Sequence, residues 1–105
     1  MTHPDYNVIQ LNISYNDLDE LPNDIDKYYN LQILYCNNNQ LISLDNLPTN
    51  LQELYCGNNK LISLDNLPPN LQTLFCGNNP LTYDFEPTIE NIRNYNTARK
   101  HSSNT

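Results

Sequence analysis

Three hexapeptides that start twenty residues apart constrain this chain more than any other feature of its sequence. They are LQILYC from Leu31, LQELYC from Leu51 and LQTLFC from Leu71, and each precedes an Asn-rich stretch and another leucine. A fixed period of this size is typical of stacked-repeat proteins. One repeat has too few apolar side chains to fold alone, so the period predicts an array in which each unit packs on its neighbours.

A fourth copy of the pattern lies upstream of the three hexapeptides, and all four copies follow LxxLx(C/I)xxNxL. The upstream copy runs from Val8 to Leu18, and its offset is 23 residues because residues 22–30 form a longer return segment. We therefore expect one domain over residues 1–105, with repeats at about 8–30, 31–50, 51–70 and 71–87.

This pattern is the signature of leucine-rich repeats, which the chain resembles from Val8 to about Leu81. The segments LPTNL at 47–51 and LPPNL at 67–71 are similar to the LPxNL of the shortest repeats, where longer classes carry a helix. They resemble the repeats of secreted bacterial effectors. The Asn- and Tyr-rich sequence with its PTIENIRNYN ending resembles small repeat proteins of giant amoeba viruses, which would make this a viral protein. A fold can be transferred on such a resemblance, whereas a function cannot.

The predicted fold class is an α/β-type solenoid. Short parallel β-strands form its concave face, the convex side is extended or irregular, and a capping helix follows the last repeat. In the second repeat the strand centres on residues 33–35, and alternation directs Leu34 and Cys36 inward while Ile33 and Tyr35 face outward. Pro48 stiffens the extended return path.

Cysteines occupy one inward position in three successive repeats, namely Cys36, Cys56 and Cys76. Their odd number and the parallel Cβ directions of in-register residues argue against disulfides. We interpret them as small buried hydrophobic residues. A zinc site is the alternative, but no histidine lies near them in the sequence, so we predict no metal and no cofactor.

A second column consists of asparagines at the ninth position of each repeat. An asparagine side chain both donates and accepts, so it can pair with backbone groups of its own and of neighbouring turns. We predict this structural role for Asn16, Asn39, Asn59 and Asn79.

The outward-facing positions are the candidate binding site. The leucine-rich repeat resemblance implies that they form the concave face, where members of the family usually bind. Rigid aromatic rings among polar groups suit protein recognition, although the same rings could instead be a cross-strand ladder that only stabilises the sheet. The predicted partner-binding residues are Tyr35, Tyr55, Phe75, Ile33, Glu53, Thr73, Asn38 and Asn58.

The two ends of the array must be treated differently from its middle. Residues from Thr88 to about Arg99 are predicted to form a capping helix with Ile89, Ile92 and Tyr95 on one stripe, followed by a loose tail at 100–105. A partner-binding amphipathic helix is the alternative. Residues 1–7 are too short for a similar cap, so the strand near Val8 is expected to be an open edge that supports weak self-association.

Charge and motifs limit the function classes. The formal net charge of −7 disfavours nucleic acid and anionic lipid as partners. No apolar run approaches a membrane span and no signal peptide is recognisable, so we expect an intracellular protein, in the cytoplasm or, for a viral protein, the host cytoplasm. No catalytic motif is present, so we predict no enzyme and no catalytic residue. Two hypotheses remain: a protein-binding module that uses its concave face, and a self-assembling or structural unit that uses its open edge.

Overall fold

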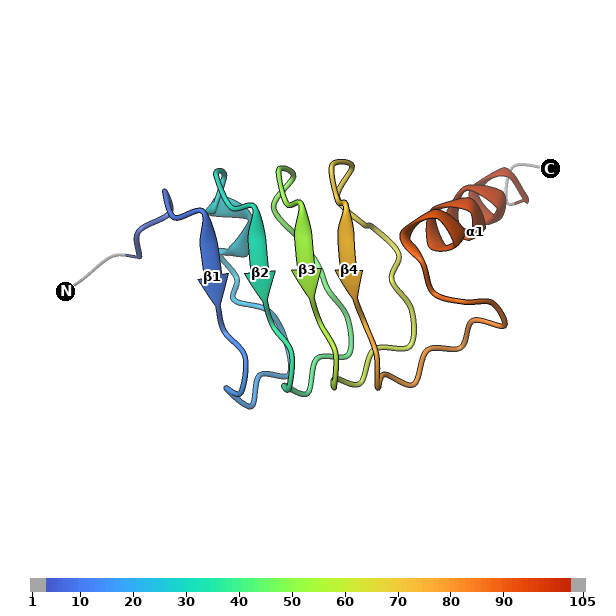
Figure 1. Ribbon diagram of the computed structural model, residues 1–105, viewed down its shortest axis with the longest axis horizontal. Coiled ribbons are helices and arrows are strands. Elements are labelled where there is room, and N and C mark those ends of the chain that lie inside the picture. The colour runs from blue at the N-terminus through green and yellow to red at the C-terminus, as the bar shows by residue number, and fades with distance from the viewer. Residues whose placement is uncertain (1–3, 103–105) are drawn as a thin grey trace.

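The computed structural model describes residues 4–102 and contains four parallel strands that lie side by side in chain order (Figure 1). Each strand spans three residues: β1 is Gln10–Asn12, β2 is Ile33–Tyr35, β3 is Glu53–Tyr55 and β4 is Thr73–Phe75. A 3-10 helix, η1 (Ile25–Lys27), lies between β1 and β2, and a helix, α1 (Ile89–Ser102), follows the last strand. The sheet and the C-terminal helix confirm the predicted leucine-rich repeat fold class.

The register of the sheet follows the sequence repeat. Leu34 pairs with Leu11 on one side and with Leu54 on the other, and Leu54 pairs with Leu74. The longer first spacing is absorbed in the return segment and leaves the strand pairing unchanged. A shift of one residue would direct every leucine of a strand to the opposite face, so the apolar pattern sets this register.

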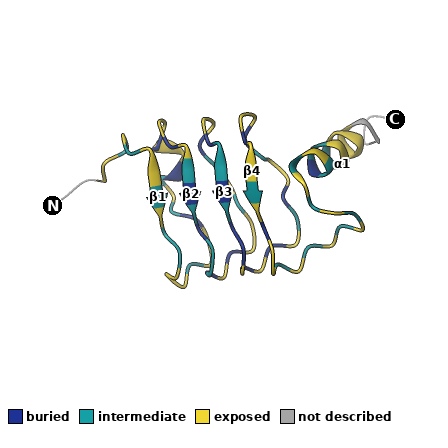
Figure 2. Ribbon diagram, viewed as in Figure 1, coloured by how far each residue is buried: buried dark blue, intermediate teal, exposed yellow. Residues whose placement is uncertain are grey.

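The core is a column of leucines that runs through the array, shown as the dark blue parts of the ribbon in Figure 2. Leu34 and Leu54 of the central strands are fully buried, whereas Leu11 and Leu74 of the outer strands are only partly buried. Each inner repeat is covered on both sides by another repeat, and an end repeat is covered on one. Stacking therefore completes the burial that no single repeat achieves.

The N-terminal end of the core is better covered than the sequence suggested. Tyr6 packs edge-on against Tyr28, with ring centroids 4.9 Å apart, and its hydroxyl donates a 2.7 Å hydrogen bond to Asp24. This hydrogen bond is the main reason that the pKa of Tyr6 is raised to about 12. Ile25 of η1 is buried beside them. Tyr6 therefore covers part of the core at this end without a capping helix, while the outer edge of β1 has no strand beside it among residues 4–102.

Helix α1 begins where the sequence indicated and ends later. The Thr88 hydroxyl accepts a 3.1 Å hydrogen bond from the Asn91 N–H, which is an N-cap contact. The helix continues to Ser102, so residues 100–102, predicted as a loose tail, are helical. No glycine or proline follows Pro87 to stop the helix, and Arg99 and Lys100 suit its negative end. Residues 103–105 of the predicted tail lie outside the described residues.

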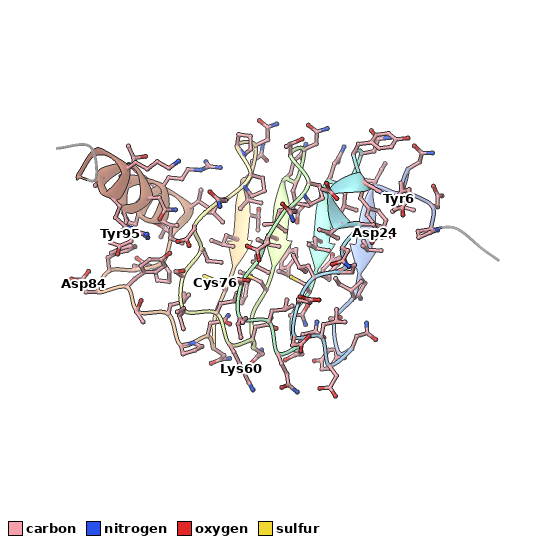
Figure 3. All side chains as sticks on the ribbon, turned by 180° about the vertical axis from the view of Figure 1, so that it is seen from behind. Tyr6, Asp24, Lys60, Cys76, Asp84 and Tyr95 are labelled. Carbon is pink, nitrogen blue, oxygen red and sulfur yellow. The ribbon has the colours of Figure 1, made fainter. Side chains whose placement is uncertain are left out.

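Helix α1 packs beside the last repeat, and no strand among residues 4–102 pairs with the outer edge of β4. Asn96 donates hydrogen bonds of 3.0 and 2.9 Å to the carbonyls of Leu64 and Asp65, so the helix packs on the third repeat's return segment. Ile92 is fully buried in the common core. Figure 3 shows Tyr95 on the helix at the end of the molecule opposite to Tyr6. Within residues 4–102, no helix is long and apolar enough to cross a membrane.

Candidate functional site

The outward side chains of β1 to β4, here called the strand face, carry a stripe of three aromatic rings. Tyr35 stacks on Tyr55 with ring centroids 4.9 Å apart and planes 11° from parallel. Tyr55 and Phe75 are 6.4 Å apart at 28°. Tyr35 and Tyr55 are half-buried by this stacking, while Phe75 at the end of the stripe is 65% exposed. The result is a stacked apolar surface that is exposed to solvent at Phe75.

Polar and aliphatic side chains border the stripe. The Tyr55 hydroxyl donates a 2.7 Å hydrogen bond to Glu53, and this bond is the main cause of the raised pKa of Tyr55. Ile33 pairs with Glu53, and Glu53 pairs with Thr73, so these three predicted residues form a second row beside the rings. The bond to Glu53 restricts the rotation of the Tyr55 ring.

Asn38 and Asn58 lie in the turns that follow β2 and β3, next to the strand face. Both have left-handed backbone, with φ of 57° and 56°, which asparagine tolerates. Their N–H groups donate 2.9 Å hydrogen bonds to the carbonyls of Gly57 and Gly77. Gly57 is close-packed here, since a Cβ on it would lie 3.2 Å from the Gly77 oxygen. Asn38 is half-buried and Asn58 is exposed, so Asn58 is the more accessible of the two.

The asparagine column links each repeat to the one before it. Asn59 donates to the carbonyls of Cys36 (3.1 Å), Cys56 (3.0 Å) and Gly57 (3.2 Å), and accepts a 3.0 Å bond from the Leu41 N–H. Asn39 and Asn79 make the corresponding bonds in their repeats. The Asn16 side chain is exposed and forms no such bonds among residues 4–102, but the Asn16 backbone N–H donates to the Asn39 side chain. We call this set the asparagine ladder.

The cysteine column lies inside the array. Cys36, Cys56 and Cys76 are all buried free thiols. Burial raises the pKa of Cys36 to about 12 and also raises the pKa values of the other two. A thiol that resists ionisation is a poor nucleophile and a poor metal ligand. Among residues 4–102, no group of three or more His, Cys, Asp and Glu side chains could hold a metal ion.

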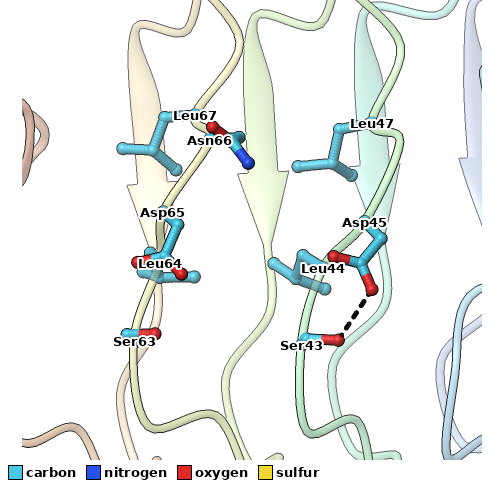
Figure 4. Close-up of a pocket in the computed structure, with 9 residues that line it drawn as sticks. All are labelled: Ser43, Leu44, Asp45, Leu47, Ser63, Leu64, Asp65, Asn66 and Leu67. Carbon is cyan, nitrogen blue, oxygen red and sulfur yellow. Dashed lines mark hydrogen bonds between the residues drawn. The ribbon is translucent and has the colours of Figure 1, made fainter. Parts of the chain in front are cut away.

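A shallow pocket on the side opposite the strand face offers little chemistry. It lies between the return segments of the second and third repeats (Figure 4). The Ser43 hydroxyl donates a 2.9 Å hydrogen bond to Asp45, and Ser63 and Asp65 line the other wall. A hydroxyl that donates to an exposed carboxylate is held in place by that bond, and no histidine lines the pocket to act as a base.

The sequence interpretation missed an aromatic cluster at the C-terminal end. Tyr83 stacks on Phe85 with centroids 4.7 Å apart, and both contact Tyr95 at 5.4 and 5.5 Å. The Tyr83 hydroxyl accepts a 2.7 Å hydrogen bond from the Leu64 N–H. The only signal was the break in the repeat pattern after Leu81, where Tyr83 and Phe85 stand at the positions that Ser63 and Asp65 occupy one period earlier.

The fold is a repeat solenoid with one accessible strand face. Each repeat contributes one parallel strand, a turn and an irregular return segment, and the asparagine ladder links the repeats. The family described as Leucine Rich repeats (2 copies) matches residues 30–69 and 49–86, which together span more than half of the chain. The chain therefore belongs to the leucine-rich repeat family. Repeats of this family generally mediate protein–protein interaction and are typically non-enzymatic. No curated protein and no solved structure matches the chain.

Proposed function

We propose that this chain is a non-enzymatic protein-binding module that binds its partner through the strand face. The observation that carries the proposal is the aromatic stripe, because a rigid stack of rings that ends in the exposed Phe75 resembles the anchors of protein interfaces. Glu53 and Thr73 beside it supply polar contacts. Family membership supports the same function class.

We expect the partner to be a protein rather than nucleic acid or a membrane, and we expect the chain to act inside the cell. The resemblance to repeat proteins of giant amoeba viruses and bacterial effectors remains a hypothesis. If it is correct, the partner is a host protein in the host cytoplasm.

A double substitution on the strand face tests this proposal. Tyr35→Ala with Tyr55→Ala should weaken the binding of a partner recovered by pull-down, since each anchoring ring contributes on the order of 1–3 kcal/mol to the binding free energy. The matched control is Ile42→Ala with Ile62→Ala, which removes two apolar side chains that are more exposed than the two rings and lie away from the strands. Circular dichroism checks the fold. Equal loss of binding in both variants, or unchanged binding in a folded strand-face variant, would contradict the proposal.

Self-association is the second candidate function. The outer edge of β1 has no strand beside it among residues 4–102, and an unpaired strand edge can pair with another chain. Sedimentation across a concentration series at low and high salt separates the two candidates. A strict monomer at high concentration in low salt excludes self-association and leaves the partner-binding function.

A further inference from the structure

The outer edge of β4 has no neighbouring strand among residues 4–102. At each inner edge the same two bonds recur: the Gln32 carbonyl accepts from the Gln52 N–H at 2.8 Å, and the Cys36 N–H donates to the Tyr55 carbonyl at 2.8 Å. The corresponding groups of the last repeat are the Gln72 carbonyl and the Cys76 N–H. Neither has a hydrogen-bond partner among residues 4–102. The edge therefore presents an acceptor and a donor at the spacing that a parallel strand uses.

An open groove lies beside this edge. Residues 72–74 form one wall, and residues 86–90, where the chain turns into α1, form the other. Leu74 and Ile89 are both only partly buried and give the groove an apolar floor. Glu86 and Glu90 are exposed on the far wall. The groove thus combines unpaired backbone, an apolar floor and two carboxylates.

We propose that this groove binds an extended basic peptide segment, which adds as a fifth parallel strand to β4. Backbone bonds to Gln72 and Cys76 would hold the segment, as they hold each strand to the next within the array. Alternation along a strand would send one set of side chains toward Leu74 and Ile89. Lysine or arginine in the other set would lie near Glu86 and Glu90. This edge adjoins Phe75, the end of the aromatic stripe, but does not include Tyr35 or Tyr55, and it adds a second recognition mode to the proposed function.

A second copy of the chain is a weaker occupant. Its free strand edge is β1, and the first repeat is acidic: residues 1–30 carry six acidic side chains and one lysine, Lys27. Pairing that edge with β4 would bring carboxylates toward Glu86 and Glu90, which is unfavourable. Charge therefore favours a basic segment of another protein.

The test uses a fluorescein-labelled hexapeptide of alternating valine and lysine, titrated with the full-length protein in low salt and followed by fluorescence anisotropy. We expect Glu86→Gln with Glu90→Gln to weaken binding about tenfold, as loss of two charge contacts predicts. The matched control is Asp19→Asn with Glu20→Gln, which removes the same charge at the other end of the array. It should change the affinity by less than about twofold. Equal weakening by both pairs would show non-specific attraction and overturn the proposal.

Two further measurements test the strand pairing itself. N-methylation of one alternate set of peptide nitrogens should abolish binding, and methylation of the other set should not, because a parallel strand bonds along one edge. Hydrogen exchange of the Cys76 amide should be fast in the free protein and slow with peptide bound. An amide that is already protected without peptide, or equal binding by both methylated forms, would refute the site. The Tyr35→Ala, Tyr55→Ala variant should keep peptide binding, which separates this inference from the proposed function.

Discussion

Replacing Asn59 by alanine tests the asparagine ladder at its most buried position. The substitution removes the acceptor of the Leu41 N–H, and Leu41 is fully buried. An unpaired buried donor costs about 1–3 kcal/mol. The side chain also supplies two N–H donors to the carbonyls of Cys36, Cys56 and Gly57, and their loss adds about 1–2 kcal/mol. We therefore expect the free energy of unfolding to fall by about 2–5 kcal/mol.

Such a loss is a large part of the free energy of unfolding of a typical domain, which is roughly 5–15 kcal/mol. Urea denaturation followed by far-ultraviolet circular dichroism measures it as a lower midpoint with an unchanged slope. The control is Asn66→Ala, since Asn66 is exposed and its side chain forms no hydrogen bond with residues 4–102; it should change stability by less than about 0.5 kcal/mol.

The neighbouring ladder position sharpens the test. Asn79 makes the same bonds but is only half-buried, so water can replace part of its side chain. Asn79→Ala should therefore cost about half as much as Asn59→Ala. A loss below about 1 kcal/mol for Asn59→Ala, or a larger loss at Asn79, would refute the account of the ladder.

Three further predictions concern the core, a turn and the C-terminal helix. Folded Cys36 has a pKa of about 12 against 9.0 for an ordinary thiol, so the unfolded chain releases this proton first. Stability should therefore fall as pH rises from about 9 to 12, and thiol reagents should react slowly until denaturant is added. Tyr15 has a φ of 58° at the position that asparagine occupies in the other repeats, so Tyr15→Asn should raise stability by about 0.5–1 kcal/mol in urea denaturation. Removing residues 86–105 takes away Ile92, which is fully buried, and uncovers the core residues around it, so light scattering should show aggregation; a monomer with an unchanged melting temperature would contradict a capping role.

The middle of the array could be predicted from the sequence because every residue there has a copy one period away. The spacing from Leu34 to Leu54 places both on one face, and the sheet pairs them directly. The asparagines and cysteines likewise follow from position, since the strand and the turn after it have the same geometry in each repeat.

The ends could not be predicted because they have no neighbouring copy. The cover that Tyr6 gives to Tyr28 depends on a contact between residues 22 positions apart, which no period of the sequence encodes. The same holds for Asn96, which bonds to carbonyls 31 and 32 residues away. The helical stripe indicated that α1 would pack on the core. It did not indicate that the helix would pack on the third repeat and leave the edge of β4 open.

The aromatic stripe is the feature that the repeat does not require. Asn12 pairs with Tyr35 in the sheet, so the outward position accepts a polar residue without loss of the strand. Phe75 gains little from stacking at 6.4 Å and remains 65% exposed. We therefore expect Phe75→Asn, which copies the first repeat, to lower stability by less than about 1 kcal/mol and to weaken partner binding more than tenfold. Urea denaturation and a binding titration measure the two effects. A large loss of stability with unchanged binding would show that the rings serve only the sheet.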